Sequence, residues 1–128
     1  MKQIIDLRIA LTDGRNDDDR QLPIFALLNL GIIQSLASGV ISAEDAAQLF
    51  YNAENCLYVR KHLKNKIADT IMSHGVQLRD LFDFLPAAEA HREFTSELEI
   101  LRSLCLKLFN RARPATLRKR KIIANPKP

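Results

Sequence analysis

Apolar side chains recur so densely between residues 23 and 37 that a helix there has almost no polar side. They fall at three- and four-residue intervals and on nearly every face: Ile24, Phe25, Leu27, Leu28, Leu30, Ile32, Ile33 and Leu36. Pro23 suits the first turn, and Gly39 predicts a left-handed stop with Val40 folded back as a hydrophobic cap. Such a helix should lie at the centre of the fold or cover a subunit interface, and Gly31 would let another helix approach closely.

A second helix is predicted to begin directly afterwards and to run for five or six turns. Ser42 offers a hydroxyl cap, and Asp45 stands where a capping box places its acid. Apolar positions then repeat at three and four residues: Ala46, Leu49, Phe50, Ala53, Cys56, Leu57 and Leu63. The sequence therefore predicts a helical hairpin made of the first two helices.

Three more helical segments follow. A short helix over residues 66–74 is expected to close at Gly75, and a segment over 77–85 stops at Pro86. The last helix, 87–111, carries glutamates at its start and basic residues at its end, which complements the helix dipole. Pro114 is expected to end it.

Residues 4–11 allow two readings. Ile5, Leu7, Ile9 and Leu11 alternate with polar residues at period two, which favours a strand. Leu7 and Leu11, with Ile4 and Ala10, also form one face of a helix. A lone strand would need a partner strand from another subunit, because no other strand is predicted in the chain.

These elements predict an all-α fold: a compact bundle of four to five helices with a possible N-terminal strand and a basic C-terminal tail. We expect one helical domain over residues 1–112 and a flexible tail over 113–128. The 128 residues are 47% hydrophobic, enough for a single core. No signal-peptide pattern opens the chain, and its longest apolar stretch, 24–36, is too short and too interrupted to span a membrane. We therefore expect a cytoplasmic protein.

The distribution of charge changes what the overall value of +4 implies. Residues 1–110 hold twelve Lys and Arg against fifteen Asp and Glu, a net charge of −3, whereas residues 111–128 carry seven bases and no acid. A basic run of this kind attracts nucleic acid or an acidic protein face, although a solvated terminus is the plainer reading. The candidate contact residues are Arg113, Arg118, Lys119, Arg120 and Lys121.

Two motifs suggest ligand binding but lack the required spacing. The aspartates of residues 13–19 resemble a calcium loop, yet the central glycine and the terminal glutamate of such a loop are missing. Residues 67–85 resemble a helix-turn-helix with Gly75 at the turn. The second helix of that motif would carry Asp80 and Asp83 toward phosphates, so we expect a structural corner without DNA contacts.

No pattern predicts a catalytic, cofactor or metal site, and we expect the chain not to be an enzyme. Glu89, Glu93 and Glu97 share a helix face but lack the histidine spacing of a helix-bundle metal site. The three histidines, His62, His74 and His91, are scattered. Cys56 and Cys105 stand among apolar residues and are expected to be free thiols.

Two functions fit this pattern. The first is a non-enzymatic protein-interaction module, regulatory or inhibitory like an immunity protein, that also forms a homo-oligomer. The alternative is a nucleic-acid-associated protein whose basic tail contacts phosphates. The stretch 30–50 is similar to helical hairpins of small bacterial proteins, a resemblance that implies no particular function.

Overall fold

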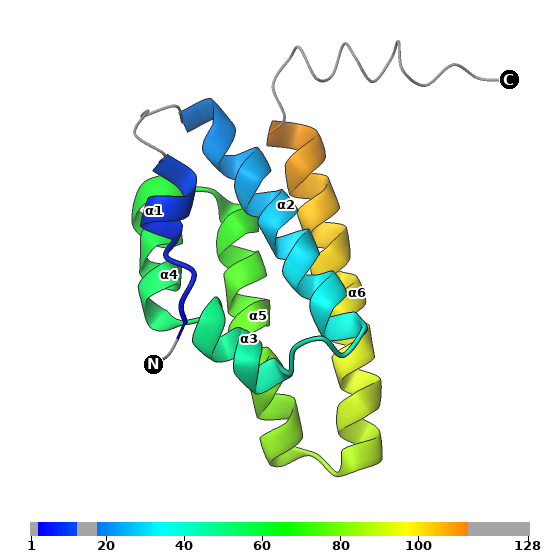
Figure 1. Ribbon diagram of the computed structural model, residues 1–128. Helices are drawn as coiled ribbons and strands as arrows, with labels where there is room; N and C mark the ends of the chain where they lie inside the picture. Colours follow the sequence, from blue (N-terminus) through cyan, green and yellow to red (C-terminus); the bar gives the residue numbers. More distant parts are fainter. Residues whose placement is uncertain (1–2, 13–17, 113–128) are drawn as a thin grey trace, which may run out of the picture.

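The computed structural model describes residues 3–12 and 18–112, and these residues form six α-helices. The predicted all-α class is confirmed (Figure 1). In chain order the elements are α1 (Leu7–Thr12), α2 (Asp18–Ala37), α3 (Ala43–Leu49), α4 (Ala53–Tyr58), the π-helical turn η1 (Val59–Leu63), α5 (Lys66–Phe84) and α6 (Ala87–Ala112). Of the two interpretations left open for residues 4–11, the helical one holds from Leu7 to Thr12, and the described residues form six α-helices where four to five were expected.

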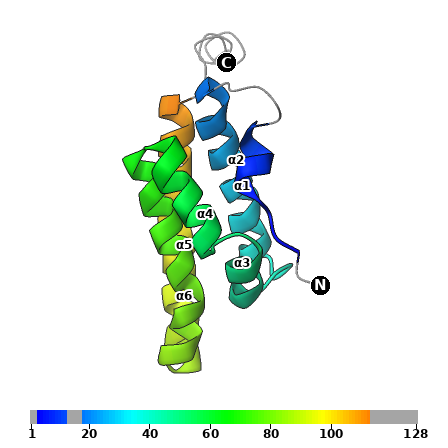
Figure 2. The ribbon, with the colours of Figure 1, turned by 90° about the vertical axis from the view of Figure 1, so that its left-hand side faces the viewer.

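Three long helices build the body of the fold. The helices α5 and α6 form an antiparallel hairpin, and α2 packs along α6 (Figures 1 and 2). The short helices α3 and α4 lie between α2 and α5 and close the core on that side. The largest fully buried side chains come mainly from the three long helices and from the residue after α3, and they include Phe25, Ile33, Ile71, Leu101 and Phe50. The turn between α5 and α6 projects beyond the ends of α2 and α3.

The helix α2 begins five residues earlier than its sequence predicts, so Pro23 lies inside it. Its predicted end is confirmed, because Gly39 has a φ of 78° and the amide of Val40 donates to the carbonyl of Ser35. The expected hydrophobic cap is wrong: the Val40 side chain is 73% exposed. Hydrogen bonds close this end of the helix instead, from backbone amides and from the hydroxyl of Ser38, which donates to the carbonyl of Gln34.

The predicted second helix is broken at residues 50–52. Its start is as expected, since Ser42 and Asp45 form the reciprocal capping box. The hydrogen bond with Ser42 lowers the pKa of Asp45. The chain then leaves the helix, and Asn52 caps α4 by accepting from the amide of Asn55. The break turns Tyr51 inward, where its side chain is buried.

The corner expected at Gly75 does not exist, because α5 runs without interruption from Lys66 to Phe84. Gly75 is needed for packing instead of for a turn. A Cβ atom built there would lie 2.3 Å from Cδ1 of the Tyr51 ring. The hydroxyl of Tyr51 donates to Oδ1 of Asn29 in α2 at 3.0 Å, and burial raises the pKa of Tyr51. Tyr51 therefore bridges α5 and α2 through the core.

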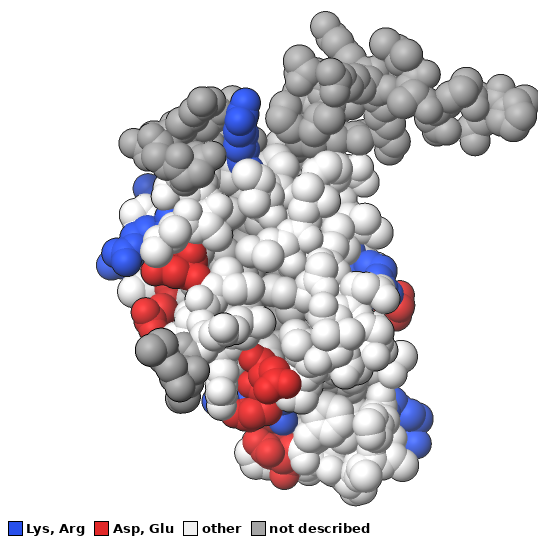
Figure 3. Space-filling view, viewed as in Figure 1, with Lys and Arg blue, Asp and Glu red and all other residues white. Residues whose placement is uncertain are grey.

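Charged side chains are spread unevenly over the surface. No charged residue occurs between Arg20 and Glu44, a stretch that contains nearly all of α2. The side of the molecule that α2 presents is accordingly white in its centre, and its charges lie toward the margins (Figure 3). The exposed part of α2 after Arg20 is thus a face without charge.

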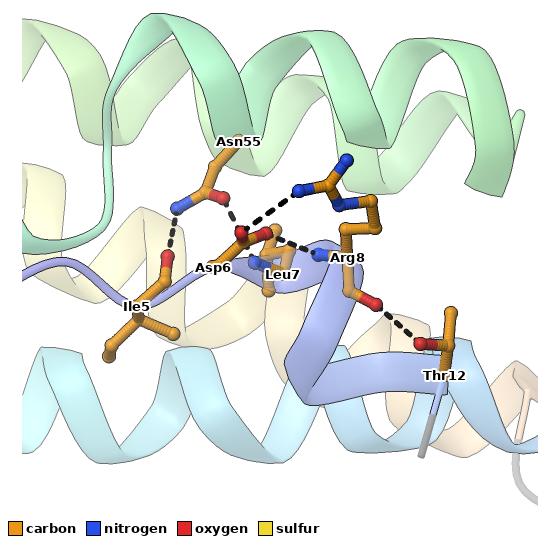
Figure 4. A network of polar contacts seen from close by, with 6 residues as sticks. All are labelled: Ile5, Asp6, Leu7, Arg8, Thr12 and Asn55. Carbon is orange, nitrogen blue, oxygen red and sulfur yellow. Dashed lines mark hydrogen bonds and ion pairs between the residues drawn. The ribbon is translucent and has the colours of Figure 1, made fainter. Parts of the chain in front are cut away.

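The N-terminal segment lies against α4 and is held there by Asn55 (Figure 4). The amide of Leu7 donates to Oδ1 of Asn55 at 3.1 Å, and Nδ2 of Asn55 donates to the carbonyls of Ile5 and Phe50 at 2.7 and 2.9 Å. The amide of Ile5 donates to the carbonyl of Leu49 at 2.8 Å. Asn55 thereby satisfies backbone groups that face each other without forming a strand pair.

The helical reading of residues 7–12 follows from this anchoring. Asp6 accepts from the amide of Arg8 at 3.0 Å and so caps the first turn of α1 (Figure 4). Leu7 and Leu11, one helical turn apart, are both buried in the core, whereas Ile9 is exposed. The helical spacing of the two leucines prevails over the alternation of the apolar residues.

Replacing Asn55 with alanine is expected to lower the free energy of unfolding by about 3 kcal/mol, because two buried backbone groups and one partly buried one lose their partner. Asn52→Ala, which removes a helix cap, is the matched control and should cost about 1 kcal/mol. Urea denaturation measures both. Equal losses for the two variants would contradict the role given to Asn55.

Replacement by alanine should have opposite effects on stability at the two helical glycines, Gly75 and Gly31. Gly75→Ala forces a methyl group into the Tyr51 ring and should destabilise the fold by about 2 kcal/mol. Nothing lies within 4 Å of the Cβ position at Gly31, so Gly31→Ala should stabilise the fold by up to about 1 kcal/mol. Thermal unfolding at low protein concentration compares them. Destabilisation by both would show that α2 is packed differently.

Candidate interaction surfaces

The turn between α5 and α6 carries the most exposed large apolar side chain of the described residues. Phe84, the last residue of α5, is 80% exposed. Pro86 ends the helix there, and α6 begins directly after it. We call residues 80–89 the hairpin tip. Since the tip projects beyond α2 and α3, Phe84 stands at an end of the molecule (Figure 1).

Phe82 supports the hairpin tip. Its ring meets the ring of Phe94 edge-on at 5.2 Å and the ring of His91 at 5.4 Å, which ties the last turn of α5 to α6. Phe84 has no ring contact of this kind among the described residues. One phenylalanine therefore stabilises the tip, and the other presents its ring to solvent.

Three carboxylates stand close to the exposed phenylalanine in the sequence. Asp80 and Asp83 lie near the C-terminal end of α5, and Glu89 lies in the first turn of α6. Glu89 is well placed for the helix dipole, but acids at a helix C-terminus cost about 0.3–1 kcal/mol each. No basic residue offsets them in the last turn of α5. The exposed ring and the two aspartates are thus unfavourable for folding, which is typical of residues kept for binding.

The exposed side of α2 forms a second candidate surface, which we call the α2 face. Its members share helical spacing and the lack of a charge: Ile24, Leu27, Leu28, Gly31, Gln34 and Ser35. Leu27 is 53% and Ile24 is 41% exposed, and Gly31 leaves a notch between them and Ser35. The face lies in the uncharged area of Figure 3.

One close pair of ionisable side chains joins two helices. Nδ1 of His74 in α5 lies 2.7 Å from Oε1 of Glu97 in α6, and both side chains are partly buried. The shallow hollow beside His74 is lined by residues of α5 alone, Ser73 among them. The carboxylate orients the imidazole toward α6, so the pair holds the hairpin together.

The other histidines also make structural contacts. The ring of His62 stacks on Tyr58 at 4.8 Å between ring centres, and His91 packs against Phe82. The described residues contain no group of three or more side chains placed to hold a metal ion. Of the glutamates considered for such a site, Glu97 is engaged by His74.

Both cysteines are free thiols. Burial raises the pKa of Cys105 to about 12 and also raises the pKa of Cys56. A thiol becomes a strong nucleophile when its pKa is lowered, so these environments suppress thiolate chemistry at both positions.

Several predicted site residues fall outside the part of the chain that the structure describes. These are the tail positions Arg113, Arg118, Lys119, Arg120 and Lys121, together with residues 13–17 of the calcium-like loop. The segment compared with a helix-turn-helix is described and contains no turn at Gly75, since it is one helix followed by the hairpin tip. That interpretation is therefore wrong.

Sequence reasoning did not identify the hairpin tip, although a signal was present. Within residues 77–85 the helical spacing puts Leu78, Leu81, Phe82 and Leu85 on one side, and Phe84 falls outside this apolar stripe. A large aromatic residue on the polar side of an amphipathic helix, three residues or fewer before its end, marks a candidate for exposure.

None of the helices in the described part of the chain is both long and apolar enough to cross a membrane. No curated protein matches the chain, and no solved structure matches it. A family model described as "Protein of unknown function (DUF3969)" matches residues 16–124, which include α2 to α6. The chain belongs to the DUF3969 family.

Proposed function

We propose that this chain is a non-enzymatic protein-interaction module of the regulatory or inhibitory kind, similar in role to a small bacterial immunity protein. It acts in the cytoplasm and also associates with itself. The observation that carries the proposal is the hairpin tip, where an 80% exposed phenylalanine stands among carboxylates at a projecting end of the fold.

The chemistry of the tip defines the partner. Burying an exposed phenylalanine is worth roughly 2–3 kcal/mol, and aromatic anchors of this kind dominate many protein interfaces. The flanking carboxylates at Asp80, Asp83 and Glu89 speed the approach of a basic surface and repel an acidic one. The matching partner is a protein with an apolar pocket and a basic rim, such as an enzyme whose site binds an anionic substrate.

The alternative function uses the tail. Residues 111–128 carry seven bases without an acid, and Arg118, Lys119, Arg120 and Lys121 form a continuous run. Such a run binds phosphates without sequence preference. The tail holds no aromatic residue for base stacking, so the contacts would be electrostatic.

A nuclease-treated pull-down from cells that make the protein tests the first function. The wild-type chain should retain a partner that Phe84→Ser loses, because the anchor is removed. Phe84→Ser should change the free energy of unfolding by less than about 0.5 kcal/mol, as befits an exposed side chain. Leu57→Ser, at a position 47% exposed on α4, is the control and should retain the partner.

The pull-down is interpreted from the protein that is recovered and from the variants that retain it. Recovery of one protein with a basic surface, lost in Phe84→Ser and weakened when Asp80 and Asp83 are both changed to Lys, supports the role of the tip. Retention of the same partner by Phe84→Ser would refute it.

Fluorescence anisotropy with labelled nucleic acid tests the alternative. If the tail binds phosphates, affinity should fall steeply with salt, with a slope near five or six released ions, and deletion of residues 113–128 should abolish binding. Far-UV circular dichroism of the shortened chain serves as the folding control. Absence of binding at about 50 mM salt, or equal binding by the shortened chain, would exclude this function.

A further inference from the structure

The α2 face has features that the fold of one chain does not require. Leu27 and Ile24 expose about half of their surfaces, and Gly31 sits between apolar positions on the same side. Gly31 has no left-handed φ and no neighbour within 4 Å of its Cβ position. A glycine in a helix interior costs about 1 kcal/mol relative to alanine. The face thus contains apolar surface and a notch that residues 3–12 and 18–112 leave unfilled.

The polar residues of the face do not compensate for this exposure. The hydroxyl of Ser35 donates to the carbonyl of Gly31 at 2.9 Å, so it is already bonded within the helix. Gln34 and Ser35 carry no charge. The α2 face therefore behaves as an apolar strip with a central gap, which suits the packing of another helix against it.

Charge identifies the occupant as a second copy of this chain. A twofold interface brings each patch against itself, so a charged patch meets its own sign. Residues 3–12 and 18–112 contain thirteen acids against eleven bases, and the hairpin tip is acidic. Two copies repel each other at such acidic surfaces, whereas the α2 face has no charge to oppose its own copy.

We propose that two copies form a dimer through their α2 faces, with the two helices antiparallel. The twofold axis passes between positions 27 and 31, so Leu27 of each copy enters the notch at Gly31 of the other. Ile24 then meets the segment near Ser35 of the second copy. This inference rests on the self-association in the proposed function, and it names the surface and the orientation.

The antiparallel orientation has independent electrostatic support. In each copy, α6 ends at Ala112 beside the first turns of α2, and the hairpin tip lies beyond its other end (Figure 1). Antiparallel pairing therefore places the start of residues 113–128 at the same end as the acidic tip of the second copy. Sixteen extended residues reach up to about 50 Å, more than the roughly 30 Å length of α2. The basic tail of one copy can reach the carboxylates of the other.

Sedimentation velocity of the full chain over a range of concentrations tests the surface. The wild type should form a reversible dimer. Leu27→Glu should weaken it by about 100-fold, since it buries a charge beside its own copy. Gly31→Gln should weaken it by filling the notch, although it favours the helix. Leu57→Glu, a change of the same kind on α4, should leave the dimer intact, and thermal unfolding confirms that each variant is folded.

A full-length variant in which Arg118, Lys119, Arg120 and Lys121 are all changed to Gln tests the orientation. The antiparallel dimer should dissociate more readily in this variant and should lose most of its dependence on salt. Equal dissociation constants for the variant and the wild type would overturn the antiparallel arrangement.

These experiments test self-association and the choice of the α2 face separately. A wild-type chain that stays monomeric at about 1 mM would overturn self-association together with this dimer. A wild-type dimer that survives Leu27→Glu and Gly31→Gln would overturn the α2 face and leave self-association standing. Neither result affects the partner bound through Phe84, because that contact is at the hairpin tip.

Discussion

The fold depends on the position of one buried aromatic side chain. Tyr51 fills the space between α2 and α5, where its ring contacts the backbone of α5 at Gly75 and its hydroxyl is bonded to Asn29 of α2. This contact requires both a break in the preceding helix and a glycine in the following one. Because α5 continues past Gly75, it extends far enough to carry Phe84 beyond the rest of the fold. The candidate binding surface is therefore a consequence of core packing.

Features that depend on neighbouring residues were predictable from the sequence, and features that depend on distant contacts were not. The capping box at Ser42, the left-handed Gly39 and the break at Pro86 are local, and each is present. The break at residues 50–52 and the continuity through Gly75 arise from one tertiary contact. The sequence therefore predicts a continuous helix where the break lies and a break where the helix continues. Considered by itself, a glycine predicts the end of a helix. At position 75 the glycine is instead required because the aromatic ring of Tyr51 packs against it.

Of the candidate surfaces, likewise, one could be predicted from the sequence and the others could not. Counting charges along the sequence is enough to identify the basic C-terminal end, because the position of charged residues is known without a structure. Exposure is a property of packing: Phe82 and Phe84 are two residues apart, yet one lies against Phe94 and the other faces solvent. The α2 segment was expected to be central or to cover an interface on the strength of its apolar residues. The structure packs one side of α2 against α6 and leaves another side exposed among the described residues.

The hairpin tip and the α2 face both contain residues that lower the stability of the fold. Folded domains have stabilities of only about 5–15 kcal/mol, so repeated local costs are significant. An exposed phenylalanine, two aspartates near a helix C-terminus and a glycine in an open helical position each carry a local cost that no contact among the described residues offsets. These costs are grouped at the tip and on the α2 face, whereas the buried polar groups of Asn55 and Tyr51 are satisfied. The described interior is thus satisfied, and the unfavourable residues are concentrated on two surfaces.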